Sequence, residues 1–348
     1  MILFLISLSG CETDLADLIL NAEEKPPIKF IVADKSAEPL LIASNPWENG
    51  LIGYCTVLKT QATKWEMWYE SFPTNSNDDY NSYLCYATSE NGIDWVKPNL
   101  GLVDYNGNKD NNIIFSGTDM NGIHGPFVFK ENGRYHLIVN QRRRKNEDPE
   151  YSIAMATSED GVNWSDFIKI FNGYSDTQNV LLDFKKKKKL FVREWIGEVS
   201  IGERAVGISR SKSTLPLLFD KSELAYRNNF EEDIYTSGAI NLNDNLTLCL
   251  NSIFNKPKEE IYLGLTYSRD GDAFYKYNED VDWQTTDNSW DNKTIYASPS
   301  LINAGNDSTY YLYYSGSQKN HDTPISSNED YITGIGRFKV LITDNNEE

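Results

Sequence analysis

The chain has few of the residues on which many enzyme sites depend. Its 348 residues include only 4 Cys and 3 His. It has no Cys-x-x-Cys pair, no His-Glu-x-x-His, no Gly-x-Ser-x-Gly and no glycine-rich phosphate loop. The commoner zinc, serine-hydrolase and nucleotide-binding signatures are therefore excluded. Cys55, Cys85 and Cys249 each lie in an apolar, strand-like context, so we expect core residues and no disulfide framework.

Positive charge is also scarce. The chain carries 33 Lys and Arg against 51 Asp and Glu, for a net charge of −18. Such a field repels a phosphate backbone, so nucleic acid is not an expected partner. The basic run Lys185 to Lys189 lies between two apolar segments and is predicted to be a solvated hairpin turn.

Long hydrophobic runs are absent as well. The apolar stretch from Ile2 to Leu8 is far too short to span a bilayer, and it leads into Leu8-Ser9-Gly10-Cys11, which resembles a bacterial lipobox. We therefore predict a lipoprotein signal peptide over 1–11 with Cys11 lipidated, and a linker over 12–27. The only helix is expected from Thr13 to Ala22. A buried first strand with an incidental cysteine is the alternative.

The segment after Cys11 bears on the location of the protein. Glu12-Thr13-Asp14 is similar to the export tags of surface lipoproteins in some Gram-negative bacteria. The expected location is the periplasm or the outer-membrane surface, with membrane contact only through the lipid.

Aromatic residues, in contrast, are abundant, with 21 Tyr, 15 Phe and 8 Trp. Helical periodicity is almost absent after residue 25, and short β-type runs recur between Asn, Asp, Gly and Pro clusters. The pattern predicts an all-β chain, with strands at Lys64 to Ser71, Tyr83 to Thr88, Tyr135 to Asn140, Leu190 to Trp195, Leu246 to Asn251 and Tyr310 to Ser315.

One motif recurs along the chain about every 60 residues. Ala87 to Trp95 is echoed by Ala156 to Trp164, and more loosely by Tyr267 to Gly271 and Gly207 to Ser211. A fifth unit begins near Ser298, and its Gly334 to Phe338 is expected to close the circle. The Ser-x-Asp/Asn-Gly turn needs a glycine at positive φ and a carboxylate or amide that accepts backbone N–H groups, so these repeats are interpreted as structural. The unit predicts a five-bladed β-propeller over 28–348.

A wider pattern of motifs resembles a bacterial group of five-bladed propeller proteins related to glycoside hydrolase families 32 and 43. The motifs are Trp65 to Tyr69, Cys85 to Ser89, Gly92 to Trp95, Lys97 to Leu102, Asp110 to Ile113, His124 to Pro126, Asp176 to Asn179, Arg204 to Gly207, Asp233 to Ser237, Ser268 to Gly271 and Tyr313 to Gly316. The resemblance implies a carbohydrate substrate in a central funnel and an acid in each of the first three blades. Family 32 enzymes also carry a C-terminal β-sandwich, which is not expected here.

Glycoside hydrolysis normally needs two carboxyl groups at the scissile bond. The polar openings of the inner strands supply the candidates. We predict Asp176 as one catalytic acid, paired with Asp233 or with Glu48, while Asp34 is an earlier alternative in the first unit.

Further residues are predicted to bind the sugar. His124 stands where family 32 enzymes would show an acid, so it is expected to bind a hydroxyl, act as acid or base, or ligate a metal. Arg193 is expected to clamp a carboxylate or sulfate on a sugar, with Trp195 on its face of the strand and Glu194 on the other. The remaining candidates are Trp47, Gln178, Arg204, Tyr235 and His321.

Three functions remain open at this point. The favoured one is a glycoside hydrolase, and the first alternative is a non-catalytic carbohydrate-binding lipoprotein of a glycan-uptake system. The second alternative is a phosphorylase, for which Arg193 and Arg204 would hold phosphate. No cofactor is expected, although a structural calcium or sodium ion in the funnel is left open.

Overall fold

The computed structural model describes residues 21–22, 25–72, 79–118, 121–143, 150–184, 187–199, 201–214, 217–322 and 332–345. Strands dominate these residues, and no α-helix occurs among them. Their one short helical element is the 3-10 helix η1 (Asp79–Asn81). The prediction of an all-β chain is therefore confirmed.

The first two sheets are four-stranded antiparallel meanders in which each strand pairs with the next. They consist of β4 (Ile52–Gln61), β5 (Lys64–Ser71), β6 (Tyr83–Ser89) and β7 (Ile113–Ser116), followed by β8 (His124–Glu131), β9 (Arg134–Arg143), β10 (Glu150–Ser158) and β11 (Ile168–Asn172). The third sheet has β12 (Val180–Phe184), β13 (Lys187–Ile196), β14 (Glu203–Thr214), β15 (Leu217–Phe219) and β16 (Glu223–Tyr226).

The remaining strands form one ten-stranded sheet with two arms. One arm has β17 (Glu232–Asn243), β18 (Leu246–Asn255), β19 (Glu260–Ser268), β20 (Tyr275–Lys276) and β1 (Asn21–Ala22). The other has β21 (Thr294–Asn303), β22 (Thr309–Ser317), β23 (Thr333–Asp344), β2 (Ile28–Lys35) and β3 (Leu41–Ile42). A single parallel pairing, Ile261 with Thr294, joins the arms.

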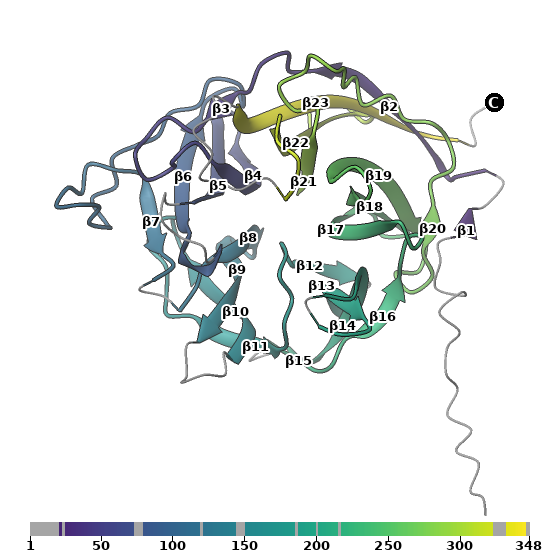
Figure 1. Cartoon of the computed structure of the whole chain (residues 1–348), viewed down its shortest axis with the longest axis horizontal. Coiled ribbons are helices and arrows are strands. Elements are labelled where there is room, and N and C mark those ends of the chain that lie inside the picture. Colours follow the sequence, from purple (N-terminus) through teal and green to yellow (C-terminus); the bar gives the residue numbers. More distant parts are fainter. Residues whose placement is uncertain are drawn as a thin grey trace, which may run out of the picture.

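The sheets surround a common centre, as in a β-propeller (Figure 1). The first strand of each group lies innermost, and β4 contacts both β8 and β21, while β17 contacts β12 and β21. The N-terminal β2 pairs with the C-terminal β23, so the two ends of the chain share one sheet. Gly334 and Ile335 of β23 also pair with Ile42 and Leu41 of β3, so the segment Gly334 to Phe338 lies in the sheet that the N-terminal strands join. Radial repetition of this kind leaves only short sheet edges.

The strands predicted from sequence are all present, with small shifts at their ends. The predicted helix from Thr13 to Ala22 is wrong at its end, because Asn21 and Ala22 form the edge strand β1, which pairs in parallel with β20. Cys11 and the rest of 1–20 lie outside the described residues. Among the described residues, none forms a helix with the length and apolarity needed to cross a membrane.

Each repeated turn connects two strands of one sheet and also contacts a neighbouring sheet. In each turn a serine Oγ accepts the glycine N–H, at Gly92, Gly161 and Gly271, and all three glycines have φ between 73° and 80°. The carbonyl of Gly161 accepts a hydrogen bond from Trp68 Nε1 of the preceding sheet, and the carbonyl of Gly92 accepts one from Tyr313. The carbonyls thus hold each turn against the sheet before it, which supports their structural interpretation.

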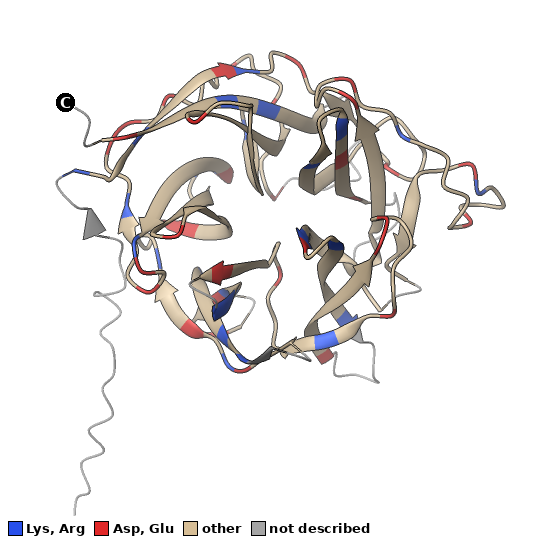
Figure 2. Ribbon diagram, turned by 180° about the vertical axis from the view of Figure 1, so that it is seen from behind, with Lys and Arg blue, Asp and Glu red and all other residues tan. Residues whose placement is uncertain are grey.

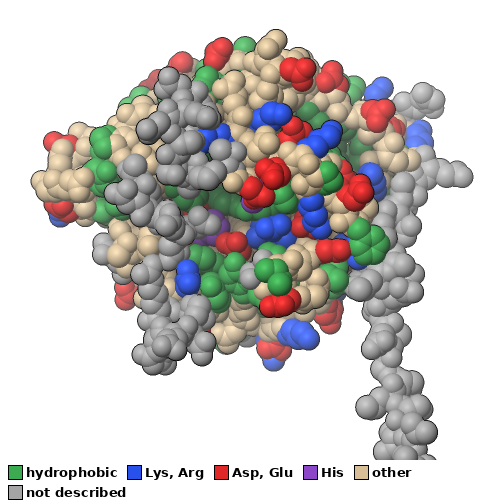
Figure 3. All heavy atoms as spheres, viewed as in Figure 1, with side chains coloured by type: hydrophobic (Ala, Val, Ile, Leu, Met, Phe, Trp, Pro, Cys, Tyr) green, Lys and Arg blue, Asp and Glu red, His purple; other side chains and the backbone are tan. Residues whose placement is uncertain are grey.

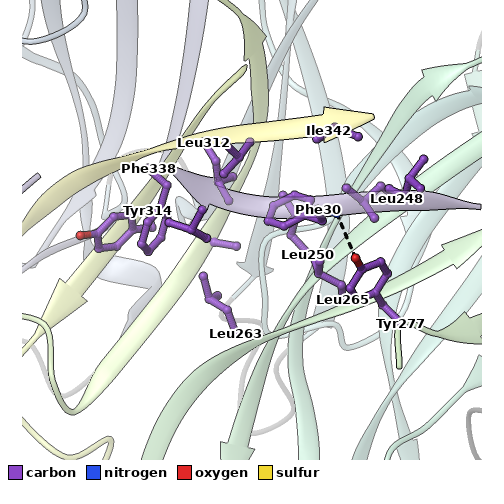
Figure 4. Close-up of a cluster of buried hydrophobic side chains, with 14 of the residues drawn as sticks. Phe30, Leu248, Leu250, Leu263, Leu265, Tyr277, Leu312, Tyr314, Phe338 and Ile342 are labelled. Atoms are coloured by element: carbon purple, nitrogen blue, oxygen red, sulfur yellow. Dashed lines mark hydrogen bonds between the residues drawn. The ribbon is translucent and has the colours of Figure 1, made fainter. Parts of the chain in front are cut away.

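The apolar core lies between the sheets rather than at the centre of the ring. Figure 4 shows the cluster between the two arms of the ten-stranded sheet, where Phe30 lies among leucines of β18 and β19 and pairs with Ile342 of β23. The Phe30 N–H also donates to the Tyr277 hydroxyl at 2.9 Å. Cys55, Cys85 and Cys249 are buried and free, so their assignment to the core is confirmed.

The basic run departs in part from its prediction. Lys187 to Lys189 do begin β13 in the β12–β13 hairpin, where Phe184 pairs with Lys187, while Lys185 and Lys186 lie outside the described residues. Lys189, however, is not solvated. It is buried inside β13 and its Nζ contacts Asp272 at 2.8 Å and the carbonyl of Gly271. This lysine therefore holds the third repeated turn against β13.

Candidate functional site

Polar side chains join the inner strands around the central axis. Gln178, two residues before β12, is buried and its Nε2 donates to the carbonyls of Cys55 and Pro126 on two other inner strands. The Thr56 hydroxyl donates to the same Pro126 carbonyl at 3.4 Å. Buried polar groups need such partners, and here the partners are backbone groups. Gln178 therefore holds the inner strands together.

Above this connection lies a hollow of about 250 Å³. Its lining includes Tyr54, His124, Tyr235, Tyr296 and His321. The rings of Tyr54 and Tyr235 both lie against Tyr296, with centroids 5.8 Å and 5.5 Å away. In Figure 3 a histidine side chain at the centre of the face lies beside acidic and basic side chains. The hollow thus combines aromatic rings with charge, as sugar sites require.

His124 lies between two carboxylates at the wall of this hollow. Its Nδ1 is 2.9 Å from Glu70 Oε1, and its Nε2 is 3.2 Å from Asp176 Oδ1. Glu70 is completely buried at the end of β5 and also accepts the Gly125 N–H and the Ser82 hydroxyl. Asp176 keeps 22% of its side-chain surface exposed. The row therefore runs from a buried acid, through the imidazole, to an acid within reach of a ligand.

The pKa values follow from this row. Burial alone would lower the pKa of His124, but the charges and hydrogen bonds of Glu70 and Asp176 outweigh it and raise this pKa well above its usual value. Burial would likewise raise the pKa of Asp176, but the hydrogen bond from His124 and the charges of His124 and Arg193 hold it well below its usual range. At neutral pH the pair is therefore an imidazolium and a carboxylate.

Two arginines extend the row on the far side of Asp176. Arg193 Nη1 is 3.4 Å from Asp176 Oδ2, and its Nη2 donates to the carbonyl of Tyr235 at 2.6 Å. Arg204 Nη1 lies 3.2 Å from Asp233 Oδ2, while Lys256 Nζ lies 2.8 Å from the other oxygen of Asp233. Both guanidinium groups lie over the ring of Tyr235, at 4.4 Å and 5.1 Å. Asp233 is thus committed to two cations.

A second hollow, of about 390 Å³, adjoins the same row. Its lining includes Tyr174, Arg193 and Trp195. The rings of Tyr174 and Trp195 are stacked with centroids 6.0 Å apart, and Tyr151 meets Tyr174 edge-on at 4.4 Å. Asp176 therefore contacts lining residues of both hollows, His124 of the first and both Arg193 and Tyr174 of the second. Aromatic walls on both sides of a carboxylate suit a chain of sugar rings.

The backbone at the site is shaped for close approach. Gly125 has a φ of +59°, and a Cβ there would meet the carbonyl oxygen of Thr177 at 2.3 Å, so the site requires glycine at this position. Tyr54 also has a positive φ, of 38°, at a bulge in β4. Such a conformation is uncommon for a bulky residue and is a feature of functional sites. It aims the Tyr54 ring at the edge of His124, 5.2 Å away.

Trp47 and Glu48 do not join this group. Glu48 is completely buried in the turn before β4, where its carboxylate accepts the N–H groups of Ser44 and Asn45, the Tyr69 hydroxyl and Lys97 Nζ. Trp47 Nε1 donates to Asn112 at 3.0 Å. Neither side chain is among the described residues that line the two hollows. The hydrogen-bonding capacity of the Glu48 carboxylate is therefore used within the protein.

The other predicted residues lie as follows. His124, Asp176, Arg193, Arg204, Asp233 and Tyr235 are brought together, and His321 joins the rim, where its ring is 4.7 Å from Tyr235 and its Nδ1 is 2.6 Å from Asp322. Glu194 points away from Arg193, as strand alternation predicted, and accepts the Ser222 hydroxyl. Gln178 is central, but its amide nitrogen is spent on backbone carbonyls and Thr56.

Glu70 and Tyr54 are among the site residues that escaped the sequence analysis. Glu70 is one of two acids inside the aromatic run of β5, and an acid in a buried strand is itself a signal, because it needs a buried partner. Tyr54 gave a weaker signal, since it opens the first inner strand inside an apolar run with no charge. The first inner strand was also assigned too early, at Trp47 and Glu48, whereas β4 begins at Ile52.

Among the described residues, no group of three or more His, Cys, Asp and Glu side chains is arranged to hold a metal ion. The three central acids are instead paired with cationic side chains, as described above. The charged groups of the row Glu70–His124–Asp176–Arg193 are therefore paired with one another.

Comparison with solved structures agrees with the predicted family resemblance. No protein-family model matches the chain, and no curated protein matches it in sequence. The structure is similar to a protein described as a glycoside hydrolase, with a TM-score of 0.58 and 13% identity over 88% of this chain and 92% of that one. It is also similar to the catalytic domain of a family 62 α-L-arabinofuranosidase from Coprinopsis cinerea, with a TM-score of 0.54 and 12% identity over 87% and 95%.

A third similar structure is a family 32 β-fructofuranosidase from Bombyx mori. Its TM-score is 0.54 and its identity 14%, over 88% of this chain and 62% of the enzyme. At these identities the likeness concerns the fold. The fold of this chain is the all-β propeller type found in glycoside hydrolases of families 32 and 43.

Proposed function

We propose that the chain is a glycoside hydrolase that acts on an oligo- or polysaccharide at the centre of a five-bladed propeller. The five blades are the strand groups that open with β4, β8, β12, β17 and β21. The carrying observation is Asp176, an ionised and partly exposed carboxylate that contacts an imidazolium and adjoins two aromatic-lined hollows.

The proposed chemistry uses His124 and Asp176 as one acid–base pair. A glycosidic oxygen that takes the place of Asp176 Oδ1 at His124 Nε2 accepts the Nε2 proton as its bond to the anomeric carbon breaks. A water molecule attacks that carbon, and its proton passes to Asp176. When the products leave, Asp176 returns the proton to His124, so the pair is restored. Glu70 keeps the imidazole charged and oriented throughout.

The test is hydrolysis of an oligosaccharide panel by the purified protein and by Asp176→Asn and His124→Gln. Wild type is expected to release product, and each variant to lose turnover by at least about a hundredfold, the usual size of a general acid or base contribution. Asp233→Asn is run beside them, because Asp233 was the predicted partner acid. Turnover that survives in Asp176→Asn would remove Asp176 from the mechanism.

One observation favours a second candidate, a carbohydrate-binding protein without catalysis. Both oxygens of Asp233 are engaged by Arg204 and Lys256, so this acid is not free to act beside Asp176. In a binding protein the same hollows would hold the glycan without cleaving it. Glycan binding with no product, unchanged in His124→Gln, would favour this candidate over the hydrolase.

We also propose that Cys11 is lipidated and anchors the protein at the cell surface or in the periplasm. The support is the lipobox-like Leu8 to Cys11 and the acidic segment that follows it. Expression of the full gene product in a Gram-negative host, with labelled palmitate, tests this. Label and membrane fractionation are expected for wild type and absent for Cys11→Ala, whereas a soluble, unlabelled wild type would contradict the anchor.

A further inference from the structure

The two arginines of the site have hydrogen-bonding capacity that the described residues leave unused. Arg193 is 3% exposed, yet its Nε has no partner among the described residues, and the same holds for the buried Nε of Arg204. A buried N–H without an acceptor is costly, so such groups call for an explanation. Both guanidinium groups lie over the Tyr235 ring, and both lie within 5.6 Å of the Trp195 ring centroid.

The charge balance at this point is positive. The cations are His124, Arg193, Arg204 and Lys256, and the anions that pair with them are Glu70, Asp176 and Asp233. These groups sum to four positive and three negative charges, which leaves +1. The whole chain, in contrast, carries −18, and acidic residues lie on loops all around the ring (Figure 2). A local excess of positive charge in an acidic protein attracts an anion to this place.

We propose that the site recognises a sugar that carries an oxyanion, a carboxylate or a sulfate, and that Arg204 and Arg193 bind it. A planar guanidinium matches the geometry of both groups. The oxyanion is placed beside Tyr235 and Trp195, because these are the only rings that both guanidinium groups lie over among the described residues. This inference rests on the proposed carbohydrate function and names the class of its ligand.

Arg204 is the better residue for a test. Its side chain is 21% exposed, whereas that of Arg193 is 1% exposed and also bonds the Tyr235 carbonyl. If Arg204 is replaced by Gln, Asp233 keeps Lys256 at 2.8 Å, so the buried acid is not left without a partner. Arg204→Lys retains the charge but loses the planar fork. Arg134, a half-exposed arginine paired with Glu159, supplies the control Arg134→Gln.

The experiment measures binding by calorimetry with matched sugars. One arm uses uronate oligosaccharides and their carboxyl-reduced counterparts, which differ only in COO⁻ against CH₂OH. A second arm uses sulfated and desulfated oligosaccharides of one backbone, and a third uses inorganic phosphate alone. We expect one acidic member to bind about tenfold to a hundredfold more tightly than its neutral counterpart, as for hydrogen bonds to charged groups.

The variants then show whether Arg204 causes the preference for the acidic sugar. Arg204→Gln is expected to bind the acidic and neutral members alike, Arg204→Lys to keep part of the preference, and Arg134→Gln to keep all of it. Thermal unfolding of each variant verifies that the fold is retained. The first two arms distinguish carboxylate from sulfate, and either one supports the proposal.

Other outcomes overturn it. Equal binding of acidic and neutral sugars would overturn the proposed recognition of an oxyanion and leave the proposed carbohydrate function intact. Binding of inorganic phosphate with no preference for an acidic sugar would also overturn it and would favour phosphorolysis. No binding of any sugar would overturn both this inference and the proposed function.

Discussion

Glu48 and Asp176 look alike in the sequence, since each is an acid beside aromatic or polar residues at the opening of a repeat. In the structure their surroundings are opposite. Glu48 has no exposed surface and accepts hydrogen bonds from four neighbours, two backbone N–H groups, Tyr69 and Lys97. Asp176 is partly exposed, contacts His124 and Arg193, which also have other partners, and accepts a hydrogen bond from the Tyr174 hydroxyl. A saturated carboxylate stabilises the fold, whereas an exposed carboxylate between cations is available to a ligand.

The largest expected effect is a difference in stability between variants of these two acids. Glu48→Gln replaces an acceptor oxygen with an NH₂ that faces donors and leaves Lys97 without its charge partner. We expect the free energy of unfolding to fall by about 3 kcal/mol, as when one partner of a buried ion pair is removed.

Asp176→Asn is the matched comparison, measured by the same denaturant titration. It should cost about 1 kcal/mol, because His124 keeps Glu70 and Arg193 keeps the Tyr235 carbonyl. If the two variants lose the same stability, the distinction between a structural and a functional acid fails.

A smaller effect concerns the pH dependence that Glu70 imposes on His124. The pKa of His124 is raised in the fold, so the charged form persists as the pH rises and is lost only when the pH passes this raised pKa. Glu70→Gln removes the negative charge beside Nδ1. The alkaline limb of the pH–rate profile should then move down by about one pH unit or more.

Glu66→Gln is the control for this experiment. Glu66 is another fully buried acid of β5, but it bonds Tyr86 and Tyr135 instead of His124. Its replacement should leave the alkaline limb in place. An unmoved limb in Glu70→Gln would show that His124 is not the acid of the reaction.

The fold could be predicted from sequence because its signals are local. The aromatic β-type run from Lys64 to Ser71 acts over a few residues, and so does the repeated turn at Gly92, Gly161 and Gly271. The site could be predicted only in part. His124 opens the inner strand β8, Asp176 lies shortly before the inner strand β12 and Arg193 lies in β13, and polar residues at such places are visible in the sequence.

What the sequence could not provide is which donors surround each acid. Glu48 is satisfied by Lys97, 49 positions away, and His124 is charged by Glu70, 54 positions away. These contacts arise from the packing of whole strands, so no local pattern distinguishes a saturated acid from an available one. The positive φ of Tyr54 is likewise set by the bulge in β4 and not by its own preference.

The smallest effect is expected in the repeated turns. Asp160 accepts the N–H groups of Val162 and Asn163, and Asn91 does the same for Ile93 and Asp94 in the first repeat. Asp160→Asn therefore copies a residue that the chain already uses, and should change the free energy of unfolding by less than about 1 kcal/mol, since the side chain is largely solvated.

The sign of this small effect with pH follows from the pKa of Asp160. Its slight burial would raise this pKa, but the hydrogen bonds from Asn163, Val162 and Ser158 lower it to about 2. The charged form thus stabilises the fold above the unfolded value of about 3.9, and this contribution is lost as the pH falls through about 2. Thermal unfolding from pH 6 to pH 2 should show wild type losing its small advantage over Asp160→Asn in that window. An advantage that instead grew as the pH fell would mean that the charge of Asp160 destabilises its turn, and that the turn at Asn91 is the better one.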